Sequence, residues 1–188
     1  MNEKRFEGLG NIYAKYRPSY PQTLIEYLYS DVGVNKESII ADIGSGTGIF
    51  SKQLLEAGNK VIAVEPNDDM RAVAEFDLGI FPNFTSLNAA AENITLDDNS
   101  VDFITVAQAF HWFDMLMFKK ECNRILKENG KVIIVYNGLD SSTEIAKEDD
   151  ENYPDYIAEL TASFNKHAVN GKAVMPNVTK SYIGVLQK

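Results

Sequence analysis

A glycine-rich segment carries the clearest chemical pattern in the sequence. Residues 42–48 read Asp-Ile-Gly-Ser-Gly-Thr-Gly and come at the end of a short apolar run. Glycines at positions 44, 46 and 48 permit a tight turn and let a ligand approach the backbone closely. If a helix follows, its first turn offers free N–H groups to that ligand. The dinucleotide pattern G-x-G-x-x-G differs, since it requires a glycine where this sequence has Ile49.

A carboxylate follows the next apolar run along the chain. Residues 61–64 are apolar, and Glu65 and Pro66 end them. A carboxylate at such a strand end can accept hydrogen bonds from both hydroxyls of a ribose. Taken alone, Glu65 could equally be a solvated residue, and the glycine segment could be a simple tight turn. Together the two features predict a site for an adenosine-containing ligand.

Apolar spacing predicts the elements that must position these residues. Buried strands are expected at residues 38–43, 61–64, 84–87, 101–106 and 131–136, with a last strand at 178–186. Helices are expected from Pro21 onward, between Gly48 and Gly58, after Asp68, over 115–126 and over 153–168. Asp114 suits the N-cap of the 115–126 helix, and Gly130 is expected to close that helix.

This order of strands and helices predicts the fold class. Strands that alternate with helices indicate an α/β protein with a parallel sheet and a ligand site at the carboxyl ends of the strands. We therefore expect a Rossmann-like, doubly wound and mostly parallel sheet of about six strands, with an antiparallel C-terminal strand.

Composition excludes several classes of protein. The chain has 188 residues, of which 45% are hydrophobic and 24% are charged, so it is not a disordered sequence. Its single cysteine, Cys122, excludes a disulfide-rich protein. Its formal charge of −9 disfavours nucleic acid as a partner, because phosphates would be repelled. No apolar run is long enough to cross a membrane, and no signal peptide is recognisable, so a cytoplasmic location is expected.

Further motifs follow one another in a definite order. They are 16–21 (Tyr-Arg-Pro-Ser-Tyr-Pro), 64–66 (Val-Glu-Pro), 91–92 (Ala-Glu), 100–102 (Ser-Val-Asp), 108–113 (Gln-Ala-Phe-His-Trp-Phe) and 124–131 (Arg-Ile-Leu with Gly-Lys at its end). With the glycine segment, this set resembles the class I S-adenosylmethionine-dependent methyltransferases. It is most similar to the small-molecule branch with ubiquinone/menaquinone-biosynthesis and trans-aconitate methyltransferase-like enzymes.

The resemblance implies a cofactor and a set of contacts to it. S-adenosyl-L-methionine would be the methyl donor, S-adenosyl-L-homocysteine the product, and a small molecule the methyl acceptor. Asp42 would orient the cofactor ammonium group, Glu65 would hold the ribose hydroxyls, and Met70 would lie against the adenine. The residues that the resemblance places at the cofactor are Tyr16, Arg17, Asp42, Gly44, Ser45, Gly46, Glu65, Pro66, Met70, Ala91, Glu92 and Gln108.

His111 is the candidate catalytic residue, because it follows the fourth predicted strand and imidazole can act as a general base near neutral pH. Alternatively, His111 only packs beside Trp112. The expected substrate pocket consists of Tyr13, Phe110, His111 and Trp112. No spacing of acidic residues, histidines or cysteines predicts a metal site.

The expected organisation is a single domain over residues 1–188. It would comprise an N-terminal lid and helix at 1–30, a cofactor-binding core at 36–137 and a shortened C-terminal part at 138–188. Because that last part is short, a cofactor-binding protein with little or no turnover is an alternative function. A nicotinamide oxidoreductase is a further alternative, since a glycine loop and an acidic residue also occur in that class, although Ile49 counts against it. A monomer is expected, with a dimer through an exposed sheet edge as the alternative.

Overall fold

The computed structural model describes residues 19–139 and 177–185. The chain divides into two compact units, residues 1–136 with 181–188 and residues 137–180. Most of the second unit lies outside the described residues, and so does the helix expected at 153–168. The expectation of one domain therefore stays a prediction. Within the described part of the chain, no helix is both long and apolar enough to cross a membrane.

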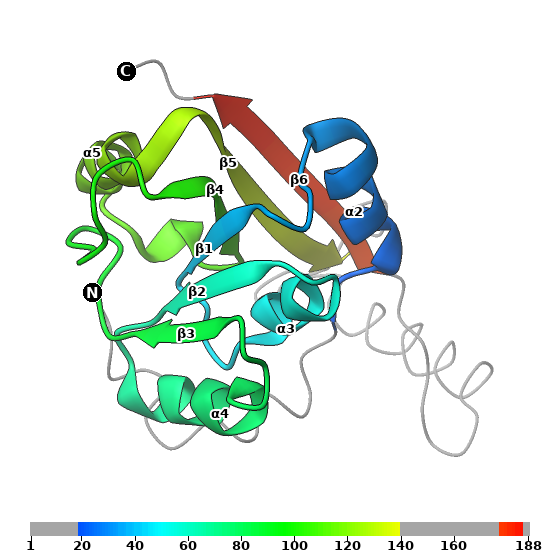
Figure 1. Cartoon of the computed structure of the whole chain (residues 1–188), viewed down its shortest axis with the longest axis horizontal. Coiled ribbons are helices and arrows are strands. Elements are labelled where there is room, and N and C mark those ends of the chain that lie inside the picture. The colour runs from blue at the N-terminus through cyan, green and yellow to red at the C-terminus, as the bar shows by residue number, and fades with distance from the viewer. Residues whose placement is uncertain (1–18, 140–176, 186–188) are drawn as a thin grey trace, which may run out of the picture. The chain divides into compact units, whose positions relative to one another are not determined.

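A six-stranded sheet forms the framework, with strand order β3-β2-β1-β4-β5-β6 (Figure 1). The first five strands are parallel where they pair, and β6 runs antiparallel beside β5. This arrangement confirms the predicted fold class. The strands are Ile39–Ile43 (β1), Lys60–Val64 (β2), Phe84–Leu87 (β3), Val101–Ala107 (β4), Leu126–Leu139 (β5) and Asn177–Val185 (β6).

Helices connect the strands much as the apolar spacing predicts. The cap of α5 is confirmed, because Asp114 accepts hydrogen bonds from the backbone N–H groups of Leu116 and Met117, each at 3.0 Å. Sequence reasoning missed the π-helical turn that follows α2. The helical segments are Gln22–Tyr27 (α2), Leu28–Val32 (η2, π-helical), Ile49–Glu56 (α3), Asp68–Leu78 (α4), Phe110–Trp112 (η3, a 3-10 turn) and Met115–Ile125 (α5).

The predicted end of α5 is wrong. The helix ends at Ile125, and Leu126 is already extended and pairs with Val101 of β4. The next paired residue is Lys131, opposite Phe103, so residues 127–130 bulge out of the ladder. Burial of Leu126 against the sheet therefore ends the helix earlier than the nearest glycine would.

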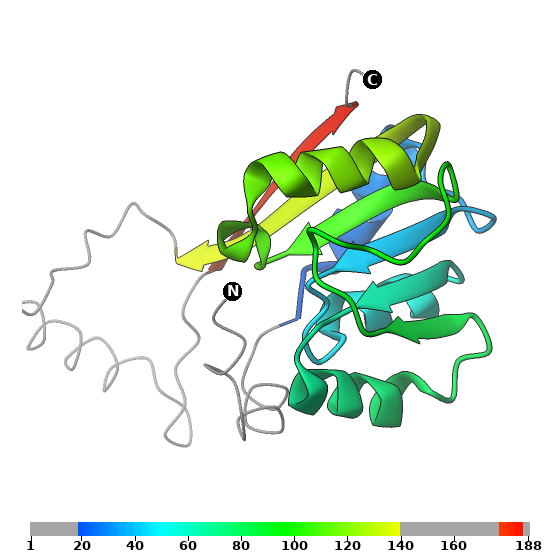
Figure 2. The same ribbon diagram turned by 90° about the vertical axis from the view of Figure 1, so that its left-hand side faces the viewer.

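Alternate residues of the central strands pack into two apolar cores, one on each face of the sheet. Ile40 belongs to the core shared with α2, η2 and α3, whereas Ala41 belongs to the core shared with α5. Figure 2 shows α5 lying along β4 and β5. Its Cys122 is 1% exposed, and burial raises the pKa of this thiol to about 12, so Cys122 is a core residue as expected.

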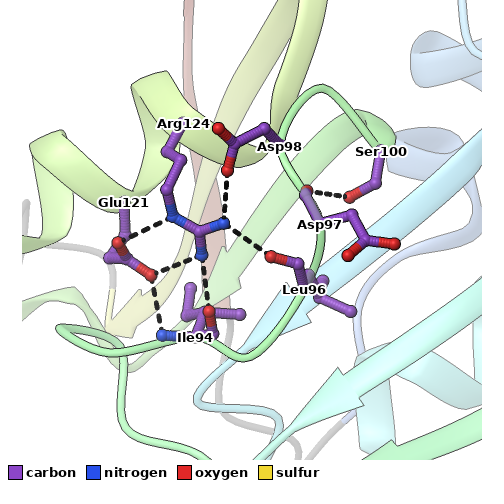
Figure 3. Close-up of polar contacts among 7 residues, drawn as sticks. All are labelled: Ile94, Leu96, Asp97, Asp98, Ser100, Glu121 and Arg124. Atoms are coloured by element: carbon purple, nitrogen blue, oxygen red, sulfur yellow. Dashed lines mark hydrogen bonds and ion pairs between the residues drawn. The ribbon is translucent and has the colours of Figure 1, made fainter.

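Arg124 of α5 holds the segment that leads into β4 (Figure 3). Its guanidinium donates to the carbonyl oxygens of Ile94 and Leu96 at 2.5 and 2.6 Å, and it pairs with Asp98 and Glu121. Glu121 in turn accepts from the Ile94 N–H at 2.7 Å. The hydrogen bonds from Arg124 lower the pKa of Glu121. One cation thus joins α5 to the segment before β4 through two backbone carbonyl groups and a carboxylate.

We expect Arg124→Ala to lower the free energy of unfolding by about 2–4 kcal/mol, because it leaves carbonyl groups and a carboxylate without their donor. The change appears as a lower urea midpoint with an unchanged m-value. Lys52→Ala is the control. The ion pair of Lys52 with Glu56 is exposed, so we expect this variant to lower the free energy of unfolding by less than about 1 kcal/mol. Equal midpoints for the two variants would contradict the role of Arg124.

Candidate functional site

Three predicted site segments meet at the carboxyl edge of the sheet. The glycine segment follows β1, Glu65 follows β2, and Gln108 follows β4. Because β1 lies between β2 and β4, the three segments leave neighbouring strands at the same edge. A parallel sheet binds its ligands at this edge, where the loops after adjacent strands diverge.

The Glu65 side chain joins two of these segments directly. Its Oε2 accepts from the Gly46 N–H at 2.9 Å, and its Oε1 accepts from the Asn67 N–H at 2.9 Å. Burial raises the pKa of the Glu65 carboxyl, while both backbone hydrogen bonds and nearby Arg71 oppose that rise. The carboxylate is therefore held in one orientation over the glycine segment.

Two glycines of the segment have different surroundings. Gly44 has a φ of 69°, and a Cβ added there would lie 2.5 Å from the Cβ of Ala109 and 3.1 Å from the ring of Phe113. Gly46 has a φ of 57°, and no described atom would lie within 4 Å of its Cβ. The segment is thus packed tightly at Gly44 and open at Gly46, where a ligand could reach the backbone.

Two buried hydroxyl groups beside these glycines lack partners. Ser45 Oγ and Thr47 Oγ1 make no hydrogen bond to any described residue, although both atoms are shielded from solvent. Buried polar groups are normally paired, so such atoms at one loop indicate a place for a polar ligand. The donors and the carboxylate here suit a ligand with a diol and polar groups.

Asp42 lies deeper than the other site residues. It is fully buried, its Oδ2 accepts from Ser51 Oγ at 2.6 Å, and its Oδ1 accepts from Thr105 Oγ1 at 2.8 Å. Burial raises the pKa of this carboxyl, and the two hydroxyl groups oppose the rise. Asp42 therefore ties β1 to α3 and β4. Its expected role at a cofactor ammonium stays a prediction.

The residues expected around the adenine lie at separate places. Met70 is buried in the first turn of α4, and its N–H donates to the capping Asn67. Ala91 packs in the apolar core. The side chain of Glu92 accepts from the Asp114 N–H at 2.9 Å, so it is directed to the start of α5. Any contact of residues 91–92 with adenine would therefore fall mainly to their backbone.

Gln108 begins the segment that carries the expected acceptor residues. Its φ of 61° is unusual for a residue with a side chain, and its N–H donates to the Val135 carbonyl at 3.0 Å. Strained backbone of this kind is concentrated at functional sites. The left-handed residue ends β4 and starts the turn that contains His111.

The structure separates the predicted pocket residues. Phe110 packs inward, with its ring centroid 6.1 Å from that of Phe118 in the core. His111 is exposed, and its ring centroid lies 4.8 Å from that of Trp112. His111 Nδ1 lies 2.9 Å from the hydroxyl of Tyr136, a residue that sequence reasoning did not place in the site. The predicted site residues Tyr13, Tyr16 and Arg17 lie outside the described residues.

Comparison with known families decides the classification. The profile of the family described as "Methyltransferase domain" matches residues 41–134, which contain the glycine segment, Glu65 and the loop after β4. The chain belongs to the methyltransferase-domain family. Membership confirms the resemblance to class I methyltransferases that the ordered motifs indicated.

Curated relatives are consistent with this family. An uncharacterized methyltransferase of Mycobacterium bovis is 38% identical over 128 residues, which are 68% of this chain and 50% of that protein. A malonyl-[acyl-carrier protein] O-methyltransferase of Marinomonas is 30% identical over 149 residues, 77% of this chain and 54% of that protein. The chain thus spans about half the length of the curated relatives that it matches.

Solved structures share the fold. The crystal structure of a SAM-dependent methyltransferase from Aquifex aeolicus superposes with a TM-score of 0.59 at 21% identity. The match covers 88% of this chain and 87% of that chain. At this identity the likeness establishes the Rossmann-like methyltransferase architecture alone.

The raised pKa of Asp42 has a consequence for stability. The folded protein binds the carboxyl proton of Asp42 more tightly than the unfolded chain does. The contribution of Asp42 to the free energy of unfolding is therefore complete below its ordinary pKa of 3.8 and is lost as the pH rises through the raised value. An asparagine has no such proton, and its amide can still pair with both hydroxyl groups.

We therefore expect the stability of Asp42→Asn, relative to the native chain, to increase as the pH rises from about 4 to neutrality. Urea unfolding at a series of pH values measures this difference. Asp77→Asn on the exposed face of α4 is the matched control and should show no such trend. If the stability of Asp42→Asn relative to the native chain stays constant or decreases as the pH rises, the Asp42 carboxylate is well tolerated in the core.

Proposed function

We propose that this chain binds S-adenosyl-L-methionine and transfers its methyl group to a small-molecule acceptor. The observation that carries the proposal is the Glu65 carboxylate, held over Gly46 at the carboxyl edge of a methyltransferase-family sheet. A ribose diol at this position would donate two charge-assisted hydrogen bonds to one rigid carboxylate. The unpaired hydroxyl groups of Ser45 and Thr47 support a polar ligand beside it.

The proposed binding roles follow from where each group lies. Glu65 would hold the ribose, and the open backbone at Gly46 would face the amino-acid part of the cofactor. The buried charge of Asp42 would favour an ammonium group near the loop, without direct exposure to solvent. Met70 would present an apolar surface to the adenine.

Little covalent assistance is required of the protein. When bound, the cofactor supplies a methyl group that its sulfonium makes electrophilic. The task of the chain is to align the acceptor with that methyl group and to exclude water. His111 and Trp112 follow β4, beside the glycine segment, and would meet the acceptor there. The name of the Marinomonas relative, a malonyl-[acyl-carrier protein] O-methyltransferase, supports an oxygen atom as the methyl acceptor.

Calorimetric titration of the native chain with S-adenosylmethionine and S-adenosylhomocysteine tests this proposal. We expect both to bind, and we expect Glu65→Ala to weaken binding by about 10- to 100-fold, the loss for charge-assisted hydrogen bonds. Glu26→Ala on the exposed face of α2 removes the same charge elsewhere and should leave binding unchanged. Thermal unfolding of each variant verifies that it is folded.

Other outcomes separate the alternative functions. Binding of NAD in place of the adenosyl ligands would indicate an oxidoreductase, and absence of adenosyl binding would refute the proposal. The titration is followed by assays of S-adenosylhomocysteine formation with a panel of small carboxylic acids, phenols, amines and thiols. Binding without turnover on any of them would favour the cofactor-binding protein over the enzyme.

A further inference from the structure

Tyr136 meets His111 because β4 and β5 are adjacent and in register. Ala107 at the end of β4 pairs with Val135 of β5, and the Gln108 N–H donates to the Val135 carbonyl. Tyr136 is the next residue of β5, and His111 lies in the short 3-10 turn that follows Gln108. The two side chains therefore come from neighbouring strand ends at the edge of the sheet where the methyl acceptor is expected.

The imidazole of His111 has a defined orientation. Its Nδ1 lies 2.9 Å from the hydroxyl of Tyr136, and its ring centroid is 4.8 Å from that of Trp112, at 45°. Within residues 19–139 and 177–185, the structure records no other hydrogen bond for either Tyr136 Oη or the His111 ring. Two aromatic neighbours thus fix the ring, and Nε2 is the nitrogen left to meet a ligand.

We propose that Tyr136 is a positioning residue for His111, whose phenol donates to Nδ1 so that the imidazole presents an Nε2–H donor to the methyl acceptor. A phenol has one proton to donate, and within the described residues His111 Nδ1 is the atom that lies at hydrogen-bond distance from it. A nitrogen that accepts this hydrogen bond carries no proton, so the ring proton is on Nε2. The inference rests on the proposed function for the identity of the bound molecule.

This arrangement assigns His111 a different chemistry from the general base expected from sequence. An Nε2–H group donates a hydrogen bond and takes up no proton. It can hold and orient an oxygen or another acceptor atom beside the methyl donor, but it cannot deprotonate that atom. The acceptor would then arrive with its lone pair already available.

Long-range ¹H–¹⁵N NMR of the full-length, ¹⁵N-labelled chain tests the tautomer without any cofactor or substrate. The chain has two histidines, so the His167→Gln variant assigns the signals of His111 directly. At about pH 8 we expect the pattern of a ring with its proton on Nε2. We expect Tyr136→Phe to move the Nδ1 signal to the position of a nitrogen that accepts no hydrogen bond.

Tyr27→Phe is the matched control, because Tyr27 is an exposed tyrosine of α2 and we expect no change in the His111 signals. A proton on Nδ1 in the native chain, or Nδ1 signals that Tyr136→Phe leaves in place, would overturn the inference. These results do not depend on adenosyl binding. Failure of the cofactor titration would refute the proposed function and leave the tautomer result standing.

A second variant distinguishes a hydrogen-bond donor from a general base. It is assayed with an acceptor of the panel that the native chain methylates. Glutamine can donate from its side-chain amide but cannot serve as a general base. We expect His111→Gln to keep turnover within about 10-fold of the native chain, whereas loss of a general base costs about 10²- to 10⁴-fold. A loss of the larger size would overturn the donor role even if the tautomer is as inferred.

Discussion

One half-buried carboxylate organises the ligand edge of this protein. Glu65 accepts from the N–H groups of Gly46 and Asn67, and these two residues belong to loops after different strands. Removing the carboxylate from water costs free energy, and these two hydrogen bonds offset that cost. The carboxylate is therefore well placed only when both donors are in position. The turn after β1 and the start of α4 are therefore coupled through a single side chain.

Other charged groups support the same edge from behind. Asp42 links β1 to α3 and β4 through Ser51 and Thr105, beneath the glycine segment. Arg124 anchors the loop before β4 to α5 through carbonyl groups and carboxylates. In each case a buried or half-buried charge gathers donors or acceptors from several elements, which favours one arrangement of the loops over others.

The proposed acceptor side differs in character from the cofactor side. His111 is exposed and Tyr136 is 37% exposed, whereas Asp42 and the hydroxyl groups of the glycine segment are shielded from solvent. Folds that serve many reactions commonly combine a rigid, buried region, which binds one constant molecule, with an open region, which binds a variable one.

Local sequence determined the strands, the glycine turn and the cap of α5, because each depends on spacing along the chain or on one residue type. It also singled out Glu65, whose role at a ligand stays a prediction. Only the tertiary structure decided how deeply Asp42 is buried, that Glu92 points to α5, that the helix ends at Ile125 before Gly130, and that Tyr136 touches His111. These features arise from contacts between residues distant in sequence. Strand order and register create them, and no local pattern records which neighbours two strands will bring together.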